Sequence, residues 1–252
     1  MTPKMIQLLA IETSSEACSV ALSVDGRLYE AHELAPLRHA EILLPAVERL
    51  LAEAGVGLSA LDAIAFGRGP GSFTSLRIGI GVVQGLAWAA GLPVVPVSSL
   101  AALAQDAVEQ SGNGAGNGAG NLPGNPDNDG APRARERICV AVDARMQEVF
   151  TAEFERDPDG LVRAAGEERV CPASAVAAGP APFVAAGNGF ERFTELEPLC
   201  RAARVCLPGL WPRAAMVLRL AEAWLQTHDA LPAALAQPVY IRNDVAEKPA
   251  SG

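Results

Sequence analysis

The sequence has few of the residues that build metal centres and disulfide frameworks. Its 252 residues include five cysteines and three histidines. The cysteines form no Cys-x-x-Cys pair, so we predict neither a zinc site nor a disulfide scaffold. A histidine pair is also lacking, because His39 is followed four positions on by Leu43 and one ligand does not fix a transition metal. We therefore expect no metal, and we interpret His39 as a polar residue at a helix start.

The sequence also lacks a recognisable catalytic arrangement. Cys18 lies in an alternating strand pattern, and neither Cys18 nor Ser72 has a histidine and an acid at a spacing typical of a nucleophile. We predict no catalytic residue, and these residues give a protease function no support.

Positive charge is scarce. The formal net charge is -9 at pH 7, whereas a protein that binds nucleic acid by itself needs clustered Lys and Arg. Any role on RNA would therefore need a basic partner. The stretch before Glu12 has no long apolar run, so we predict no signal peptide and expect a cytoplasmic protein.

Charge is absent altogether between Ile78 and Ala104. Pro93 and Pro96 interrupt this stretch and leave a helix of about 16 residues, shorter than the ~20 that cross a bilayer. We predict a buried helix followed by a buried strand at Val94–Val97, and no membrane span.

Apolar residues, in contrast, make up 50% of the sequence, enough for a sizeable core. A Gly/Asn/Pro-rich tract at residues 111–136 has almost nothing to bury and predicts a flexible insertion. A nucleic-acid arm using Arg133, Arg135 and Arg137 is the less favoured interpretation in so acidic a chain. We predict a first subdomain over 1–110 and a smaller second one over 137–211. In the remaining region, 212–252, a helix over 213–226 packs back on the first subdomain and a tail follows.

One pattern occurs twice: an apolar strand, an acid, a turn, a strand, an Asp-Gly hairpin and a third strand. It begins at residues 6–11 with Glu12 and again at residues 138–142 with Asp143. The repeat predicts a duplicated α/β fold, similar to the actin, Hsp70 and sugar-kinase (ASKHA) architecture. Those ATPases have glycine in the first turns, where phosphate approaches the backbone. Both turns lack glycine here, which argues against an active ATP site. The candidates for any bound nucleotide or Mg²⁺ are Glu12, Thr13, Ser14 and Asp143; solvated turn residues are the alternative.

The loop after the strand at residues 61–66 is the first candidate for function. From Phe66 it reads F-G-R-G-P-G-S-F-T-S-L-R-I-G-I-G. A loop that opens a helix presents free N–H groups that can hold an anion or a partner's acidic group. It matches neither the Walker nor the dinucleotide pattern, and a tight strand-to-helix turn explains it equally well.

Two predicted helices carry more apolar surface than one sheet contact needs. The helix over residues 41–54 has an apolar stripe through Leu43, Val47 and Leu50 that neighbouring apolar residues widen. In the next helix, Gly81 and Gly85 share one face, where the lack of side chains lets another backbone come close. Both features predict a packing partner.

Five segments together resemble the TsaB, or YeaZ, family: residues 11–22, 39–45, 69–79, 140–150 and 238–243. They occur in that family's order and span nearly the whole chain apart from the Gly/Asn tract. The resemblance implies a non-catalytic subunit in the formation of N6-threonylcarbamoyladenosine in tRNAs that read codons beginning with A. It implies a TsaD-type catalytic partner and a TsaE-type ATPase, with tRNA contacted only through the complex. It also implies a homodimer when the chain is alone.

The resemblance places the pairing surface on the two helices of the first half. The residues it implies are His39, Ile42, Leu43, Ala46, Val47, Leu50, Gly69, Pro70, Gly71, Ser72, Phe73, Thr74, Arg77, Ile78, Gly81, Val82 and Gly85.

On this basis Gly81→Arg and Leu50→Glu are expected to abolish partner binding and to leave the monomer folded. The alternative function is a weak ATP-binding ATPase or kinase of the ASKHA class, with Gly187-Asn188-Gly189 as a second glycine loop. Binding of ATP, ADP or Mg²⁺ at the partner interface is a further alternative that the sequence leaves open.

Overall fold

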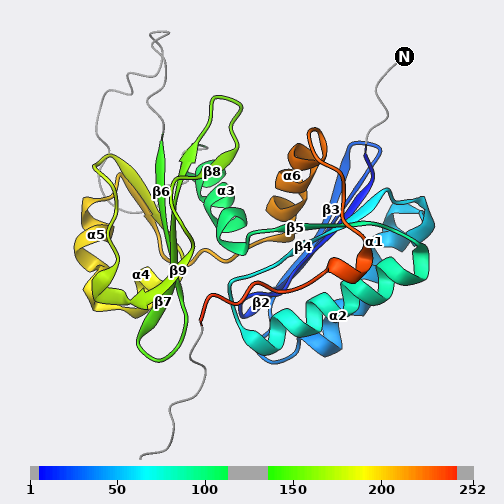
Figure 1. The fold of residues 1–252 in the computed structure, drawn as a ribbon, viewed down its shortest axis with the longest axis horizontal. Coiled ribbons are helices and arrows are strands. Elements are labelled where there is room, and N and C mark those ends of the chain that lie inside the picture. The colour runs from blue at the N-terminus through cyan, green and yellow to red at the C-terminus, as the bar shows by residue number, and fades with distance from the viewer. Residues whose placement is uncertain (1–5, 113–135, 243–252) are drawn as a thin grey trace, which may run out of the picture.

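A computed structural model describes residues 6–112 and 136–242 (Figure 1). The insertion predicted over 111–136 therefore lies almost wholly outside the described residues, as does the tail after residue 242.

The first sheet has five strands in the order β3-β2-β1-β4-β5. Strands β1 to β3 form an antiparallel meander, and β4 and β5 run parallel to β1. Two helices cover the outer face and end at glycines in the left-handed conformation, Gly55 with φ 69° and Gly91 with φ 66°. The elements are β1 (Leu8–Glu12), β2 (Ala17–Val24), β3 (Arg27–Leu34), α1 (His39–Ala54), the 3-10 turn η1 (Leu58–Ala60), β4 (Ala63–Gly67), α2 (Phe73–Ala90) and β5 (Val94–Val97).

The second sheet has the order β11-β10-β6-β7-β8, with β9 paired to β7. Its outer face is covered by short helical pieces. The elements are β6 (Arg137–Asp143), β7 (Glu148–Arg156), β8 (Val162–Ala164), β9 (Arg169–Pro172), η2 (Ala173–Ala175), β10 (Phe183–Ala186), α4 (Gly189–Arg192), η3 (Thr194–Leu196), α5 (Glu197–Ala202) and β11 (Val205–Leu207).

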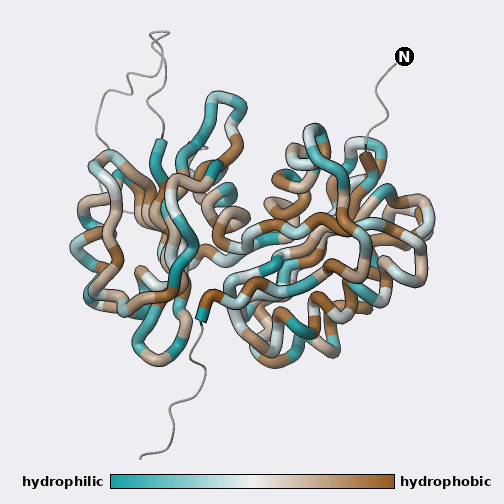
Figure 2. Tube along the Cα trace, in the orientation of Figure 1, coloured by the Kyte–Doolittle hydropathy of each residue, from teal (hydrophilic) through white to brown (hydrophobic). Residues whose placement is uncertain are grey.

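The two sheets are copies of one topology. In each, the first strand is antiparallel to the second strand and parallel to the strand on its other side, so β6 corresponds to β1 and β10 to β4. The inner strands β1, β4, β6 and β10 consist almost wholly of buried residues, and hydrophobic and hydrophilic stretches alternate along the rest of the chain (Figure 2). The predicted duplicated α/β fold is confirmed.

Two helices are exchanged between the halves. Helix α3 (Ser99–Gly112) follows the last strand of the first sheet, but it packs Leu100 and Leu103 on the second sheet. Helix α6 (Ala214–Leu225) follows the last strand of the second sheet and packs Val217 and Ala221 on the first. The two helices contact each other and form a middle layer between the sheets (Figure 1).

This exchange corrects the predicted boundary at residue 110, which assigns residues 99–110 to the first subdomain. Most buried apolar side chains of α3 belong to the core of the second sheet, namely Leu100, Leu103, Ala104, Ala107 and Val108. Helical periodicity gives the apolar stripe of a helix but does not say which sheet the stripe meets.

The segment after α6, residues 226–242, returns along the first half and reaches the second. Leu231 forms a bridge with Val94, and η4 (Ala233–Leu235) follows. The Val239 N–H donates to the Arg68 carbonyl over 2.9 Å, and Arg242 pairs with Glu148 of β7. We call residues 226–242 the C-terminal segment; it touches both halves (Figure 1).

One disulfide is present, although the cysteine spacing predicted no disulfide scaffold. Cys200 of α5 and Cys206 of β11 are bonded, with Cα atoms 5.4 Å apart. Cys18, Cys139 and Cys171 are free, and burial raises the pKa of the Cys18 thiol to about 11 and that of Cys139 to about 12. Neither buried thiol is suited to act as a nucleophile.

Candidate partner surface and inter-half cavity

The glycine-rich loop between β4 and α2 packs directly on the turn after β1. A Cβ at Gly67 would overlap the Glu12 carboxylate, and one at Gly71 would overlap the Ser14 carbonyl. The Ser72 N–H donates to that carbonyl over 2.7 Å. The glycines therefore permit close contact between two loops of the same half. This agrees with the interpretation of the glycine-rich loop as a tight strand-to-helix turn.

Glu12 lies beneath this contact, fully buried. Its carboxylate accepts hydrogen bonds from the Ser14 N–H over 2.6 Å and from the Ser99 hydroxyl over 2.7 Å. Burial raises the pKa of this carboxyl, and the hydrogen bonds oppose the shift. Glu12 thus joins the turn, the loop and the start of α3.

This placement corrects part of the predicted nucleotide or Mg²⁺ set. Glu12 and Thr13 are buried, and the Thr13 hydroxyl donates to the Ser75 carbonyl over 2.9 Å. Ser14 and Asp143 do border a cavity between the halves. Within residues 6–112 and 136–242, no group of three or more His, Cys, Asp or Glu side chains could hold a metal ion.

The cavity lies between the two halves and has a volume of about 660 Å³. The first half, the β6–β7 turn and the C-terminal segment all contribute to its wall. Lining residues include Ser14, Glu16, Leu37, Ser72, Phe73, Arg77, Asp143, Arg145, Met146, Trp211, Tyr240 and Arg242.

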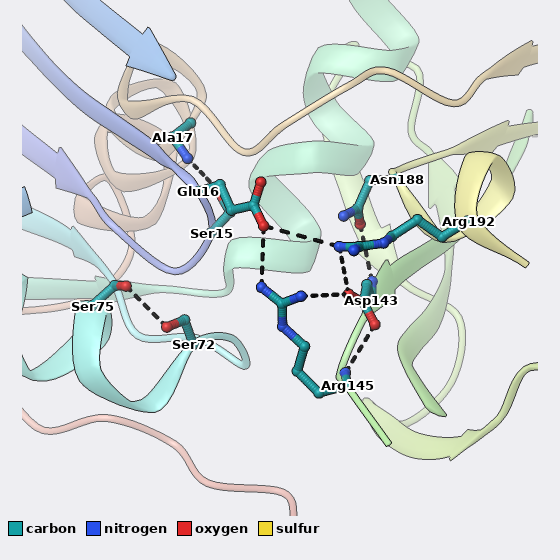
Figure 3. A network of polar contacts seen from close by, with 9 residues as sticks. All are labelled: Ser15, Glu16, Ala17, Ser72, Ser75, Asp143, Arg145, Asn188 and Arg192. Carbon is teal, nitrogen blue, oxygen red and sulfur yellow. Dashed lines mark hydrogen bonds and ion pairs between the residues drawn. The ribbon is translucent and has the colours of Figure 1, made fainter. Parts of the chain in front are cut away.

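An ion network crosses the cavity wall from one half to the other (Figure 3). Glu16 of the first half pairs with Arg145 at 3.1 Å and with Arg192 at 3.9 Å. Asp143 pairs with the same two arginines, at 3.6 Å and 2.8 Å, and its N–H donates to the Asn188 side-chain oxygen. Since Asp143 is already paired with two cations, its charge is compensated without a bound ion.

The predicted partner residues of α1 separate into core and surface. His39, Leu43, Val47 and Leu50 are each at most 2% exposed, and they belong to α1's inner face. A ring nitrogen of His39 lies 3.2 Å from the Ala17 carbonyl, which only an N–H can satisfy, so this nitrogen is the donor. These four residues cannot touch a partner, and this part of the prediction is corrected.

The same correction applies to Gly69 and Pro70, which are buried in the loop. Of the other predicted partner residues, Ile42, Ala46, Gly71, Ile78 and Val82 are partly exposed, and Ser72, Phe73, Thr74, Arg77, Gly81 and Gly85 are exposed.

We define the α1/α2 surface by the members of that set that lie on the two helices, together with Trp88. Trp88 is 80% exposed, and no atom lies within 4 Å of the position of a Cβ on Gly81 or Gly85. Trp88 follows Gly81 by seven residues on the same side of α2 and could have been found from that spacing. The residues are Ile42, Ala46, Phe73, Thr74, Arg77, Ile78, Gly81, Val82, Gly85 and Trp88.

Helix α2 is the one helix in the described parts of the chain with the length and apolar composition of a membrane span, and 33% of its residues are buried. Its inner face, with Ile80, Val83 and Ala87, belongs to the first core. The remaining apolar surface is what a protein partner would cover.

Two halves of one strand order, joined by exchanged helices across a cavity, define an actin-like α/β protein. The chain is 35% identical over 258 residues to the Escherichia coli (strain K12) tRNA threonylcarbamoyladenosine biosynthesis protein TsaB, covering 98% of this chain and 99% of the relative. The chain belongs to the TsaB (YeaZ) family, whose members are named for tRNA threonylcarbamoyladenosine biosynthesis.

A solved structure is similar to the chain in both fold and sequence. YeaZ from Pseudomonas aeruginosa matches with a TM-score of 0.79 and 43% identity, covering 94% of this chain and 100% of that chain. The family model "TsaD: tRNA N6-adenosine threonylcarbamoyltransferase" matches residues 32–115. A tRNA N6-adenosine threonylcarbamoyltransferase of Bordetella petrii is 44% identical over 68 residues, which cover 27% of this chain and 20% of that protein. The first half is therefore also similar to the transferases.

Proposed function

We propose that the chain is a non-catalytic activating subunit in the formation of N6-threonylcarbamoyladenosine in tRNAs that read codons beginning with A. It binds a TsaD-type catalytic subunit through the α1/α2 surface. The observation that carries this proposal is the apolar outer face of α2, where Gly81, Gly85 and Trp88 are exposed. Similarity between the first half and the transferases favours a partner of the same fold, because related helix pairs can pack face to face.

The remaining parts of the proposal follow from this role. A TsaE-type ATPase joins the pair, and tRNA is contacted only through the complex, in keeping with the net charge of -9. In the absence of the partner the same surface joins two copies of the chain. The complex works in the cytoplasm.

A weak ATPase of the ASKHA class is the second candidate. Its motivation is the cavity between the halves, at the place where those enzymes bind nucleotide. Against it stands the first turn, in which Glu12 and Thr13 are buried under the glycine loop.

The test is reconstitution of threonylcarbamoyl transfer to tRNA with the catalytic subunit and the TsaE-type ATPase, with this chain omitted and then restored. We expect transfer only when the chain is restored, and no ATP hydrolysis by the chain alone. Hydrolysis alone, without any effect on transfer, would favour the ATPase.

The surface is tested by the affinity of the chain for the catalytic subunit. Gly81→Arg places a charged side chain on an open helical position, so we expect at least a hundredfold loss of affinity with a melting temperature that is not lowered. Glu191→Arg, an exposed change on α4 of the second half, is the matched control and should bind as before. Equal affinity of both variants would rule out the α1/α2 surface.

Leu50→Glu, expected from the sequence to act on the surface, is not a useful variant. Leu50 is 1% exposed in the first core, and a carboxylate there would lack a partner. It would unfold the first half rather than report on binding.

A further inference from the structure

The cavity between the halves is rimmed by apolar side chains that the fold leaves in solvent. Four of the nine large exposed hydrophobic residues in the described parts of the chain border it. These are Leu37, Phe73, Met146 and Tyr240, and Leu37 is 97% exposed. Large exposed apolar patches on soluble proteins mark binding sites. The four apolar side chains around this cavity therefore indicate that it binds a ligand.

Two of these side chains belong to residues with an unfavourable backbone conformation. Leu37 has φ 65° and Met146 has φ 54°, in the left-handed region that residues with a side chain rarely adopt. Arg145 and Gln147 flank Met146 with φ 65° and 61°. Conformations of this kind cluster at ligand sites, because there the surrounding structure holds them in place.

The arginines that line the cavity differ in their partners. Arg145 pairs with Glu16 and Asp143, and Arg242 pairs with Glu148. Arg77 has no carboxylate partner within residues 6–112 and 136–242. Its guanidinium lies 3.6 Å from the centroid of the Phe73 ring, and its Nε–H donates to the Tyr240 hydroxyl over 2.9 Å.

The contact with Phe73 is a cation–π interaction, and with the Tyr240 bond it positions Arg77 without supplying a carboxylate partner. A guanidinium has five N–H donors, and the Tyr240 bond uses one of them. Phe73 and Tyr240 lie with ring centroids 5.3 Å apart, so two aromatic rings and a cation without a carboxylate partner among the described residues meet at one side of the cavity. This combination suits a ligand with a flat apolar body and one negative group.

We propose that the cavity is a binding site for a small amphipathic anion. Its flat apolar body lies against Phe73, Tyr240 and Met146, and its carboxylate, sulfonate or phosphate group pairs with Arg77. The volume of about 660 Å³ is within the range of small-molecule sites. The site is formed by this chain alone, but it shares Phe73 and Arg77 with the predicted partner residues, so it is tested without the catalytic subunit.

The test uses the full chain without partners and the dye 8-anilinonaphthalene-1-sulfonate, which has flat rings and one fixed negative charge. Dye fluorescence gives the dissociation constant. Arg77→Gln removes the charge from an exposed side chain, and we expect roughly tenfold weaker binding, as for the loss of a charge-assisted contact. Arg49→Gln is the control, because Arg49 is an exposed arginine of α1 that pairs with Glu53 and does not line the cavity.

Two more variants locate the dye. Met146→Glu places a negative charge on the rim and should weaken binding by more than Arg77→Gln does. Trp88→Ala removes the largest exposed apolar side chain of the α1/α2 surface and should leave binding unchanged. Unaltered binding by Arg77→Gln and Met146→Glu, or loss of binding by Trp88→Ala, would overturn the proposal.

Competition identifies the anionic group. Phenylacetate supplies a carboxylate and phenyl phosphate a phosphate, each on one flat ring. Displacement of the dye by either compound, and weaker displacement from Arg77→Gln, supports the site and gives its preferred anion. Failure of both compounds to displace the dye would refute an anion site.

Discussion

The two halves share one strand order but differ in what covers their outer faces. The first sheet carries α1, with 16 residues, and α2, with 18, whereas the second carries α4, with 4, and α5, with 6. Within the described residues, no large exposed hydrophobic side chain lies on the outer layer of the second half, but Trp88 and Leu44 are exposed on that of the first. Short helical pieces are therefore enough to cover such a sheet, and the longer helices of the first half offer a surface beyond what the fold requires.

The first turns of the two halves differ in the same way. The turn after β1 is sealed by the glycine loop, with Glu12 to Ser15 at most 7% exposed, and only Ser14 and Ser15 of these four residues border the cavity. The turn after β6 is open to the cavity, and three of its residues have positive φ. The acid at the strand end is thus a structural residue in one half and part of an ion network in the other.

The largest effect should come from glycines after β4 and β10 that pack against the backbone of the neighbouring strand or turn in their own half. A Cβ at Gly71 would overlap the Ser14 carbonyl, and one at Gly187, with φ 111°, the Ala141 carbonyl. We expect Gly71→Ala and Gly187→Ala each to lower the free energy of unfolding by about 3 kcal/mol or more, measured by urea denaturation. Gly81→Ala has open space and should raise it by about 0.5–1 kcal/mol. Normal stability of both destabilised variants would contradict the close loop contacts.

A smaller effect is expected on the affinity for the catalytic subunit when the outer layers of the two halves are compared by substitution. Trp88→Ala should weaken binding of the catalytic subunit by about 2 kcal/mol, or about thirtyfold, because an exposed tryptophan that becomes buried is a typical hot spot. Glu195→Ala, an exposed change on the outer layer of the second half, should leave affinity unchanged. Calorimetric titration of both variants measures the difference. If Glu195→Ala has the larger effect, the two layers have been assigned the wrong roles.

The sealed turn predicts a pH effect. The pKa of Glu12 is raised above 4.5 in the folded protein, so the folded state binds the proton more tightly than the unfolded state does. Its contribution to stability is complete at low pH and is lost as pH rises through the folded pKa. The free energy of unfolding of the natural protein, minus that of Glu12→Gln, should therefore decrease as pH rises above 4.5. A difference that increases with pH would contradict this burial.

The smallest effect is expected at the open turn. The Arg145 side chain is 65% exposed, so its pairs with Glu16 and Asp143 are screened by water. Arg145→Ala should lower the free energy of unfolding by about 0.5 kcal/mol at low salt and by less at high salt. A loss above that of Gly71→Ala would show that the network, rather than the exchanged helices, holds the halves together.

Much of this fold could be predicted from periodicity and turn residues. Strand β5 lies at the expected residues 94–97, and the repeated strand, acid and turn pattern predicted the duplication. Helix α3 was missed, although Leu100, Leu103, Ala104 and Ala107 have helical spacing. Its packing partner lies in the other half, and local patterns carry no information about such distant contacts.

The candidate surface was predicted less well, for a related reason. The wide apolar stripe of α1 combines core residues such as Leu43 with flanking residues such as Ile42, and a sequence does not separate the two. The cavity could not be predicted at all, because the C-terminal segment brings Tyr240 to Phe73 over a long sequence separation. The glycines of the loop were the clearest sign of function in the sequence. In the structure they are needed because the loop packs closely against the turn after β1.

The exchanged helices have a consequence for protein synthesis. A ribosome makes the first sheet early, yet the cover of its inner face, α6, ends at Leu225. The nascent chain therefore carries an uncovered apolar sheet until nearly all of the described sequence has been translated. A chain truncated before residue 214 would keep that sheet exposed to chaperones, proteases and other nascent chains.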